Sequence, residues 1–196
     1  PDEVKAIADP AKAAGLRVHM DGARFANAMA FLGVPAKAVT WQAGVDALSF
    51  GATKGGAMAA ECVVFFDEKL AQSFAYRRMR GGHLVSKMRF VSAQLNAFFA
   101  DGLWLKLARH ANAMAQRLAQ GLQRIPGARL VHPVEANELF VVLPAAVIAG
   151  LRDAGAEFYD WAGEPNMIRL VTAWETEPAK VERFLKVAAE VAAQAA

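Results

Sequence analysis

The fold is indicated by two stretches of the sequence, residues 19–24 (His-Met-Asp-Gly-Ala-Arg) and residues 49–56 (Ser-Phe-Gly-Ala-Thr-Lys-Gly-Gly). Each one reads as the end of a buried strand that runs into a polar turn. Apolar runs that predict strands alternate with amphipathic patterns that predict helices; the strands are 16–20, 46–50 and 62–66, and the helices are 3–14 and 24–32. This alternation indicates an α/β layer with a mostly parallel sheet. Ligands bind such sheets beyond the carboxyl ends of the strands, which is where Asp21 and Lys54 fall.

The second half of the chain has a different pattern. A helical pattern runs from Leu84 to about Leu122, with a break near Asp101 and Gly102. Short strands and helices follow, as expected of antiparallel strands covered by two helices in a small α+β domain. We therefore expect three parts: a partial large domain over 1–90, connecting helices over 91–125 and a small domain over 126–196. Within the first helix, Pro10 is expected to kink the helix or to restart it.

The composition restricts the class of protein. Of the 196 residues, 55% are hydrophobic and 21% are charged, and no apolar run is long enough to span a membrane. The net charge is +3, but the lysines and arginines are scattered, which is typical of a solvated surface and argues against nucleic-acid binding. The single cysteine, Cys62, cannot form an internal disulfide, so we expect a cytoplasmic protein. We assign no residues to a metal.

Lys54 and Asp21 together indicate a cofactor. The Lys54 amine stands between small residues, where it can form an imine, and a carboxylate such as that of Asp21 can keep a ring nitrogen protonated. These are the two groups that pyridoxal phosphate requires of its protein. Thr53 or Ser49 can donate a hydroxyl hydrogen bond to the phosphate. Taken alone, each signal has a simpler interpretation, because a lysine beside glycines is commonly a surface-loop residue and Asp-Gly is a turn signal.

Four motifs of this sequence resemble the pyridoxal-phosphate enzymes called low-specificity L-threonine aldolases. They are His-Met-Asp-Gly-Ala-Arg-Phe-Ala-Asn-Ala (19–28), Ser-Phe-Gly-Ala-Thr-Lys-Gly-Gly (49–56), Gly-Gly-His-Leu-Val-Ser-Lys-Met-Arg-Phe (81–90) and Ile-Arg-Leu-Val-Thr (168–172). The resemblance covers essentially the whole chain, although the family's chains are longer at the amino end. It implies the aspartate-aminotransferase fold, fold type I. The expected architecture is the later part of the cofactor-binding large domain, followed by a small α+β domain.

The resemblance also implies roles for single residues. Lys54 would form the imine with the cofactor, and Asp21 would pair with the pyridinium nitrogen. Arg24 and Arg169 would bind the substrate carboxylate, because a guanidinium matches a carboxylate through two parallel hydrogen bonds. For each arginine, a solvated surface position is the simpler alternative.

The glycine-rich segment 81–83 and the residues beside it have less certain roles, because the match to the family is weaker there. Many relatives carry an arginine shortly after the paired glycines, whereas this chain has a lysine, Lys87. Lys87 or Arg80 would therefore supply the cation near the phosphate, often across a subunit interface. His83 would line the substrate pocket, unless it is an ordinary surface-loop residue.

The implied activity is cleavage of a β-hydroxy-α-amino acid to glycine and an aldehyde. The implied partners are a small amino-acid substrate and further copies of the chain in a homodimer or homotetramer. Two alternatives stay open, namely another pyridoxal-phosphate enzyme (an aminotransferase or a β-eliminating lyase) and a non-catalytic lobe. Because the chain begins with Pro1 and lacks the family's amino-terminal residues, we expect a truncated protein that is inactive by itself and exposes apolar surface.

Overall fold

The structure is a computed structural model and describes residues 1–195. The chain divides into two compact units, unit 1 (Pro1–Lys106) and unit 2 (Leu107–Ala196). The three-part division expected from the sequence stays a prediction.

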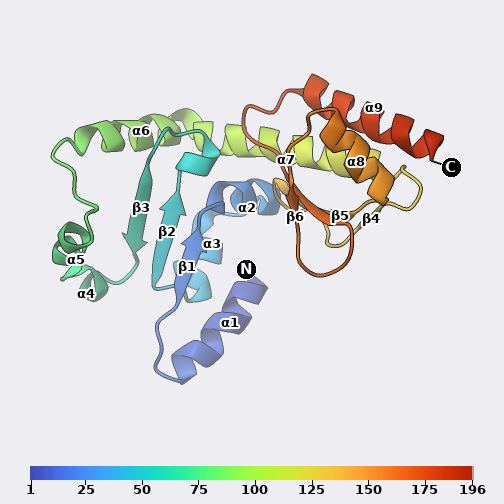
Figure 1. Cartoon of the computed structure of the whole chain (residues 1–196). Helices are drawn as coiled ribbons and strands as arrows, with labels where there is room; N and C mark the ends of the chain where they lie inside the picture. The colour runs from blue at the N-terminus through green and yellow to red at the C-terminus, as the bar shows by residue number, and fades with distance from the viewer. Residues whose placement is uncertain (196) are drawn as a thin grey trace. The chain divides into compact units, whose positions relative to one another are not determined.

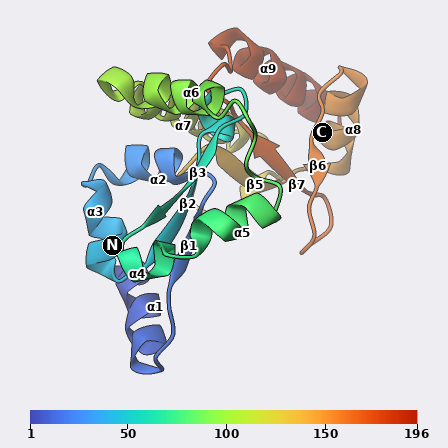
Figure 2. The same cartoon turned by 90° about the vertical axis from the view of Figure 1, so that its left-hand side faces the viewer.

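Unit 1 is built on a three-stranded sheet with the strand order β1-β2-β3 (Figure 1). Its elements are α1 (Asp2–Ala13), β1 (His19–Gly22), α2 (Phe25–Leu32), α3 (Ala36–Val39), η1 (Trp41–Ala43), β2 (Ala47–Gly51), η2 (Thr53–Gly55), β3 (Glu61–Phe65), α4 (Glu68–Ala71), α5 (Phe74–Arg80), α6 (Arg89–Phe99) and η3 (Ala100–Gly102). Strands β1 and β2 are parallel, as the sequence predicts, whereas β3 is antiparallel to β2. The connection from β2 to β3 is short and contains no crossover helix, so the chain returns in the opposite direction. Figure 2 views this unit from the side where α4 and α5 lie nearest the viewer.

Strand β1 begins later than the sequence indicates. Leu16 was expected to begin a strand, but its backbone N–H donates to Ala11 O, and Gly15 adopts φ +70°. This is the Schellman arrangement that closes a helix with a left-handed glycine. Strand β1 therefore begins at His19. The expected restart at Pro10 is also wrong, because α1 continues through that residue.

The core of unit 1 lies on one face of the sheet. Leu48 and Phe50 of β2 are buried there, with the Phe50 ring in edge contact with the rings of Phe25 and Phe98 at 6.0 and 6.3 Å. Because side chains alternate along a strand, Ser49 points to the opposite face. That second face carries the residues that the motifs single out.

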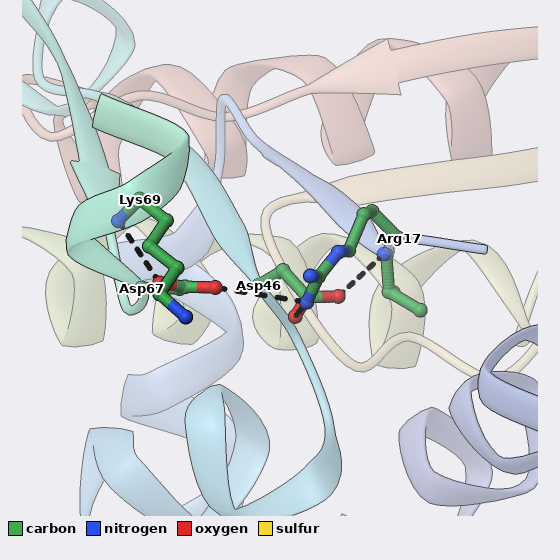
Figure 3. A network of polar contacts seen from close by, with 5 residues as sticks. Arg17, Asp46, Asp67 and Lys69 are labelled. Atoms are coloured by element: carbon green, nitrogen blue, oxygen red, sulfur yellow. Dashed lines mark hydrogen bonds and ion pairs between the residues drawn. The ribbon is translucent and has the colours of Figure 1, made fainter. Parts of the chain in front are cut away.

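A polar network joins the three strands at the end of the sheet that lies away from these motifs (Figure 3). The buried Asp46 carboxylate, at the start of β2, accepts hydrogen bonds from Val18 N (2.8 Å) and from Arg17 Nη1 (3.3 Å). Arg17 Nη1 also lies 3.7 Å from Asp67 Oδ2, just after β3. The Asp67 carboxylate in turn accepts a bond from Lys69 N at the start of α4. The network fixes where β1 and β2 begin and where β3 ends.

The long helical segment begins later than predicted and is interrupted once. Helix α6 begins at Arg89, so the prediction that residues 84–88 are helical is wrong. The predicted break near Asp101 and Gly102 is confirmed, since both residues have positive φ. None of the helices within residues 1–195 combines the length and the apolar character needed to cross a membrane.

Unit 2 is an α+β unit, as the sequence predicts. Its four-stranded sheet has the order β4-β5-β7-β6, and every pairing is antiparallel. The remaining elements are α7 (Leu103–Leu122), β4 (Arg129–Leu130), β5 (Glu138–Val142), α8 (Ala145–Asp153), β6 (Tyr159–Asp160), β7 (Met167–Val171) and α9 (Pro178–Gln194). Leu139 and Ile168 of the central strands are buried in one core with residues of α7, α8 and α9. Three helices therefore contribute to this core, one more than expected.

Candidate active site

Asp21 and Ser49 are neighbours on the exposed face of the sheet in unit 1. They are register partners at the carboxyl ends of the parallel strands β1 and β2. The Asp21 carboxylate accepts a hydrogen bond from Ala23 N (3.0 Å), and no cation within residues 1–195 pairs with it. Asp21 therefore lies at the carboxyl end of a parallel strand, as the sequence predicts, and its role toward a ligand stays a prediction.

His19 was not singled out by the sequence analysis, but it belongs to the same face. Its Nε2 lies 2.8 Å from Ser49 Oγ, so the ring and the hydroxyl form a hydrogen bond across the two strands. The sequence carries the signal, because residues two apart in a strand share a face and His19 precedes Asp21 by two.

Two glycines allow β1 and β2 to approach each other closely at this edge. A Cβ atom on Gly51 would lie 2.8 Å from Ala23 Cα, and one on Gly22 would lie 2.7 Å from Ser49 O. Such distances are too short for any side chain, and the atoms met belong to the backbone. Glycine at both positions therefore brings the turn after Asp21 against the end of β2.

Lys54 lies in the 3-10 turn η2, immediately after β2. Its side chain is exposed, and within residues 1–195 its amine makes no hydrogen bond or ion pair. The turn itself is held firmly: Gly55 lies so close to Phe98 that an added Cβ would be 2.8 Å from the ring. A free amine on a fixed turn is the arrangement that covalent attachment of a carbonyl ligand requires.

Thr53 is used within the same turn. Its hydroxyl donates to Ala60 O (3.3 Å) and accepts from Ala60 N (3.1 Å), and its own backbone N–H donates to Glu61 Oε1. The hydroxyl thus closes the loop between η2 and β3. Of the two hydroxyls proposed for phosphate binding, that of Ser49 is therefore better placed to face a ligand.

The other predicted residues of unit 1 are less closely connected with this edge. Arg24 is half-buried and immediately precedes α2, three residues after Asp21. His83 and Lys87 are exposed on the segment between α5 and α6. Neither of these two side chains forms a hydrogen bond or an ion pair with Asp21, Ser49 or Lys54 in the part of the chain that the structure describes.

Arg169 lies in unit 2, on the outer face of the small sheet. It forms an ion pair with Glu138, and its guanidinium lies 5.3 Å from the centre of the Trp161 ring. Only 20% of its side chain is exposed. This arrangement is not that of a solvated surface arginine, although the ion pair with Glu138 was not anticipated.

Comparison with known proteins identifies the family. Residues 1–146 match the family described as beta-eliminating lyase, and the chain belongs to that family. The chain is 46% identical over 184 residues to a low specificity L-threonine aldolase of Pseudomonas sp. (strain NCIMB 10558), covering 94% of this chain and 53% of the relative. It is 44% identical over 191 residues to that of Pseudomonas aeruginosa, covering 97% and 54%. The chain thus spans about half the length of the curated relatives it matches.

Solved structures agree with this assignment. The threonine aldolase of Leishmania major superposes with a TM-score of 0.89 at 28% identity, covering 97% of this chain and 56% of that one. A putative L-allo-threonine aldolase of Listeria monocytogenes has a TM-score of 0.70 at 19% identity, covering the same shares, and supports the fold alone. The resemblance to threonine aldolases and the fold class expected from the motifs are confirmed. The roles of the individual site residues stay predictions.

The residues at the edge of β1 and β2 fit pyridoxal phosphate chemically. The fit rests on three groups: a carboxylate bonded only to a neutral backbone donor, a free amine and a hydroxyl on the same face. A carboxylate without a cationic partner can accept a hydrogen bond from a protonated ring nitrogen. No described residue at this edge obstructs that assignment.

Proposed function

We propose that this chain belongs to a pyridoxal-phosphate-dependent lyase that cleaves a β-hydroxy-α-amino acid of the threonine type to glycine and an aldehyde. The chain would contribute the lysine that binds the cofactor. The observation that carries the proposal is the placement of Asp21 and Lys54 at adjoining strand ends in a chain 46% identical to a low specificity L-threonine aldolase. A cytoplasmic location and a homodimeric or homotetrameric assembly belong to the same proposal.

Pyridoxal phosphate, when bound, supplies the electron sink that makes cleavage at the α-carbon of an amino acid feasible. Lys54 would hold the cofactor covalently through its amine. Asp21 would accept a hydrogen bond from the ring nitrogen and keep the proton on that nitrogen. Ser49, whose hydroxyl is oriented by His19, would donate to the phosphate, and Lys87 would add a positive charge near it.

The arginines and the exposed histidine complete the proposal. Arg24 and Arg169 would bind the substrate carboxylate, and this fixes which bond of the substrate is aligned for cleavage. Holding a substrate in a reactive orientation lowers the barrier by several kcal/mol, up to about 10 in favourable cases. His83 would line the pocket beside the substrate.

The assignment of Lys54 is tested by reduction with borohydride. We expect the protein expressed from its complete reading frame to retain the cofactor covalently on the peptide that contains Lys54. Lys54→Ala should abolish this labelling and the visible absorbance together. Lys87→Ala is the matched control, because it also removes an exposed lysine, and it should leave the label in place. Label recovered on Lys87 would overturn the assignment.

A second reaction of the same class is suggested by the family, which is described as beta-eliminating lyase. β-Elimination uses the same lysine and aspartate but yields a 2-oxo acid and ammonia. Glycine as the product from threonine would support aldol cleavage. A 2-oxo acid from serine or threonine, without glycine, would support elimination.

A further inference from the structure

We propose that Glu138 is a positioning residue for Arg169, holding its guanidinium in one orientation so that it can receive the substrate carboxylate. This inference rests on the proposed function, because it takes Arg169 to be the carboxylate-binding residue. Glu138 is not part of any of the four motifs, and it lies 31 positions from Arg169 in the sequence.

The sheet of unit 2 places the two side chains on one face. Arg169 is in the central strand β7, opposite Phe140 of β5 and Tyr159 of β6. Glu138 precedes Phe140 by two residues, so it points to the same face and lies diagonal to Arg169. Diagonal neighbours in a sheet are within reach of long side chains. Here the guanidinium Nη2 donates to Glu138 Oε1.

The ion pair is partly shielded from water. The Glu138 and Arg169 side chains are 23% and 20% exposed. Another ion pair of unit 2 is much more open, with 45% and 59% exposure for Arg117 and Glu182. Charged hydrogen bonds that are shielded from water are stronger and better ordered than those on the open surface.

The Trp161 ring restrains the guanidinium from a second direction. The Arg169 guanidinium carbon lies 5.3 Å from the ring centre, and the ring contacts Phe140 at 5.3 Å between centroids. A carboxylate at one edge of the guanidinium and an aromatic ring over its face leave little rotational freedom. A free arginine side chain carries roughly 2 kcal/mol of rotamer entropy, and ordering it in advance lowers the cost of binding a ligand.

One part of the guanidinium remains available for a ligand. Of the side-chain nitrogens of Arg169, only Nη2 has a hydrogen-bond partner within residues 1–195. An arginine side chain has five N–H donors, so several are left for a second carboxylate. Glu138 thus fits an orienting role, provided that the substrate uses the remaining donors and does not displace it.

The test uses the protein expressed from its complete reading frame with bound cofactor, and it compares Glu138→Ala with Glu138→Gln. Binding of glycine is followed by the change in cofactor absorbance, which requires no turnover, and KM and kcat are measured with threonine. We expect Glu138→Ala to raise the glycine Kd and the threonine KM about tenfold with kcat changed less than about threefold, because the loss is in binding. Glu138→Gln keeps an oxygen acceptor for Arg169 and should stay within about threefold of the parent.

Glu182→Ala is the matched control, since it removes the carboxylate of the exposed ion pair with Arg117 and should not change glycine binding. Circular dichroism and the Tm of each variant show whether it is folded. If Glu138→Ala does not fold, glycine binding is compared between Glu138→Gln and Glu138→Leu instead, and we expect only Glu138→Gln to bind glycine as the parent does. Unchanged or tighter glycine binding in Glu138→Ala would overturn the inference, and tighter binding would identify Glu138 as a competitor of the substrate.

The failure of the proposed function would look different. If Arg169→Lys binds glycine as well as the parent does, or if the parent does not bind glycine, then the carboxylate-binding role of Arg169 is wrong and the inference falls with it. If Arg169→Lys weakens binding and Glu138→Ala does not, only the role of Glu138 is wrong.

Discussion

At the scale of single residues, the structure separates groups that bind within the fold from groups that are free to bind a ligand. The Thr53 hydroxyl is bonded twice to Ala60, whereas the neighbouring Lys54 amine is free within residues 1–195. Both side chains are polar and adjacent in sequence. The difference arises because the loop that leads to β3 folds back onto Thr53 and forms its hydrogen bonds there, whereas it forms none with the Lys54 amine.

Cys62 offers a residue-scale prediction. Burial raises the pKa of the Cys62 thiol, and the neighbouring Glu61 carboxylate raises it further. Because the thiolate is the reactive form, iodoacetamide should modify the folded 196-residue chain at pH 8 several times more slowly than the urea-unfolded chain. The rate for the folded chain should increase as the pH rises beyond the ordinary pKa of a thiol.

Glu61→Gln is the matched variant for this prediction, because it removes the charge and keeps an oxygen that can accept from Thr53 N. It should lower the pKa of Cys62 and increase the alkylation rate. Equal rates for the folded and unfolded chains would contradict the prediction.

At the scale of elements, the register of the sheet in unit 1 depends on the network at the start of β1 and β2. The Asp46 carboxylate accepts from Val18 N, and the Asp46 backbone exchanges further bonds with Val18 O and Phe66 N. Asp46 therefore connects the starts of the parallel strands β1 and β2 with the end of β3. Parallel strands have no tight turn to set their register, so such side-chain contacts carry more of that role.

We expect Asp46→Ala to lower the free energy of unfolding by about 1–3 kcal/mol, because it leaves Val18 N without its buried acceptor. Asp67→Ala removes only the longer contact with Arg17 and the cap of α4, and it should cost about 1 kcal/mol or less. Urea denaturation followed by circular dichroism measures both. Equal losses for the two variants would show that the hydrogen bond from Val18 N to the Asp46 carboxylate is not what stabilises this end of the sheet.

At the scale of the whole chain, several large apolar side chains of unit 1 are exposed. Met58, Tyr76, Ile7 and Phe90 are 89%, 73%, 69% and 62% exposed. In addition, β1 and β3 are the outer strands of the three-stranded sheet. Exposed apolar surface and outer strands both favour association with further protein.

The 196-residue chain expressed by itself should therefore associate as its concentration rises, and it should bind the dye ANS. Light scattering after size-exclusion chromatography measures the association. Replacing Tyr76 and Phe90 by Gln should reduce both signals, whereas replacing the buried Val181 of unit 2 by Ala should not. A monomer at all concentrations, without ANS binding, would contradict the prediction.

Local sequence patterns were sufficient for the three strands of unit 1, for helices α1 and α2, for the parallel pairing of β1 with β2 and for the placement of Asp21 and Lys54 at strand ends, but not for the short helices α3, α4 and α5. These features depend on apolar alternation and turn residues, which act over a few neighbouring positions. The same patterns identified the family through motifs around these residues, and the comparisons confirm that identification.

Other features were decided only by the tertiary structure. The later start of β1, the antiparallel direction of β3, the bonding of the Thr53 hydroxyl and the pairing of Glu138 with Arg169 were not foreseen. The last three of these features depend on which other segment of the chain packs beside a residue. The sequence around an ionisable side chain does not show which residue it pairs with. The sequence around an arginine can look the same on the surface and in a binding site, so the contacts of Arg169 with Glu138 and with the Trp161 ring became known only from the tertiary structure.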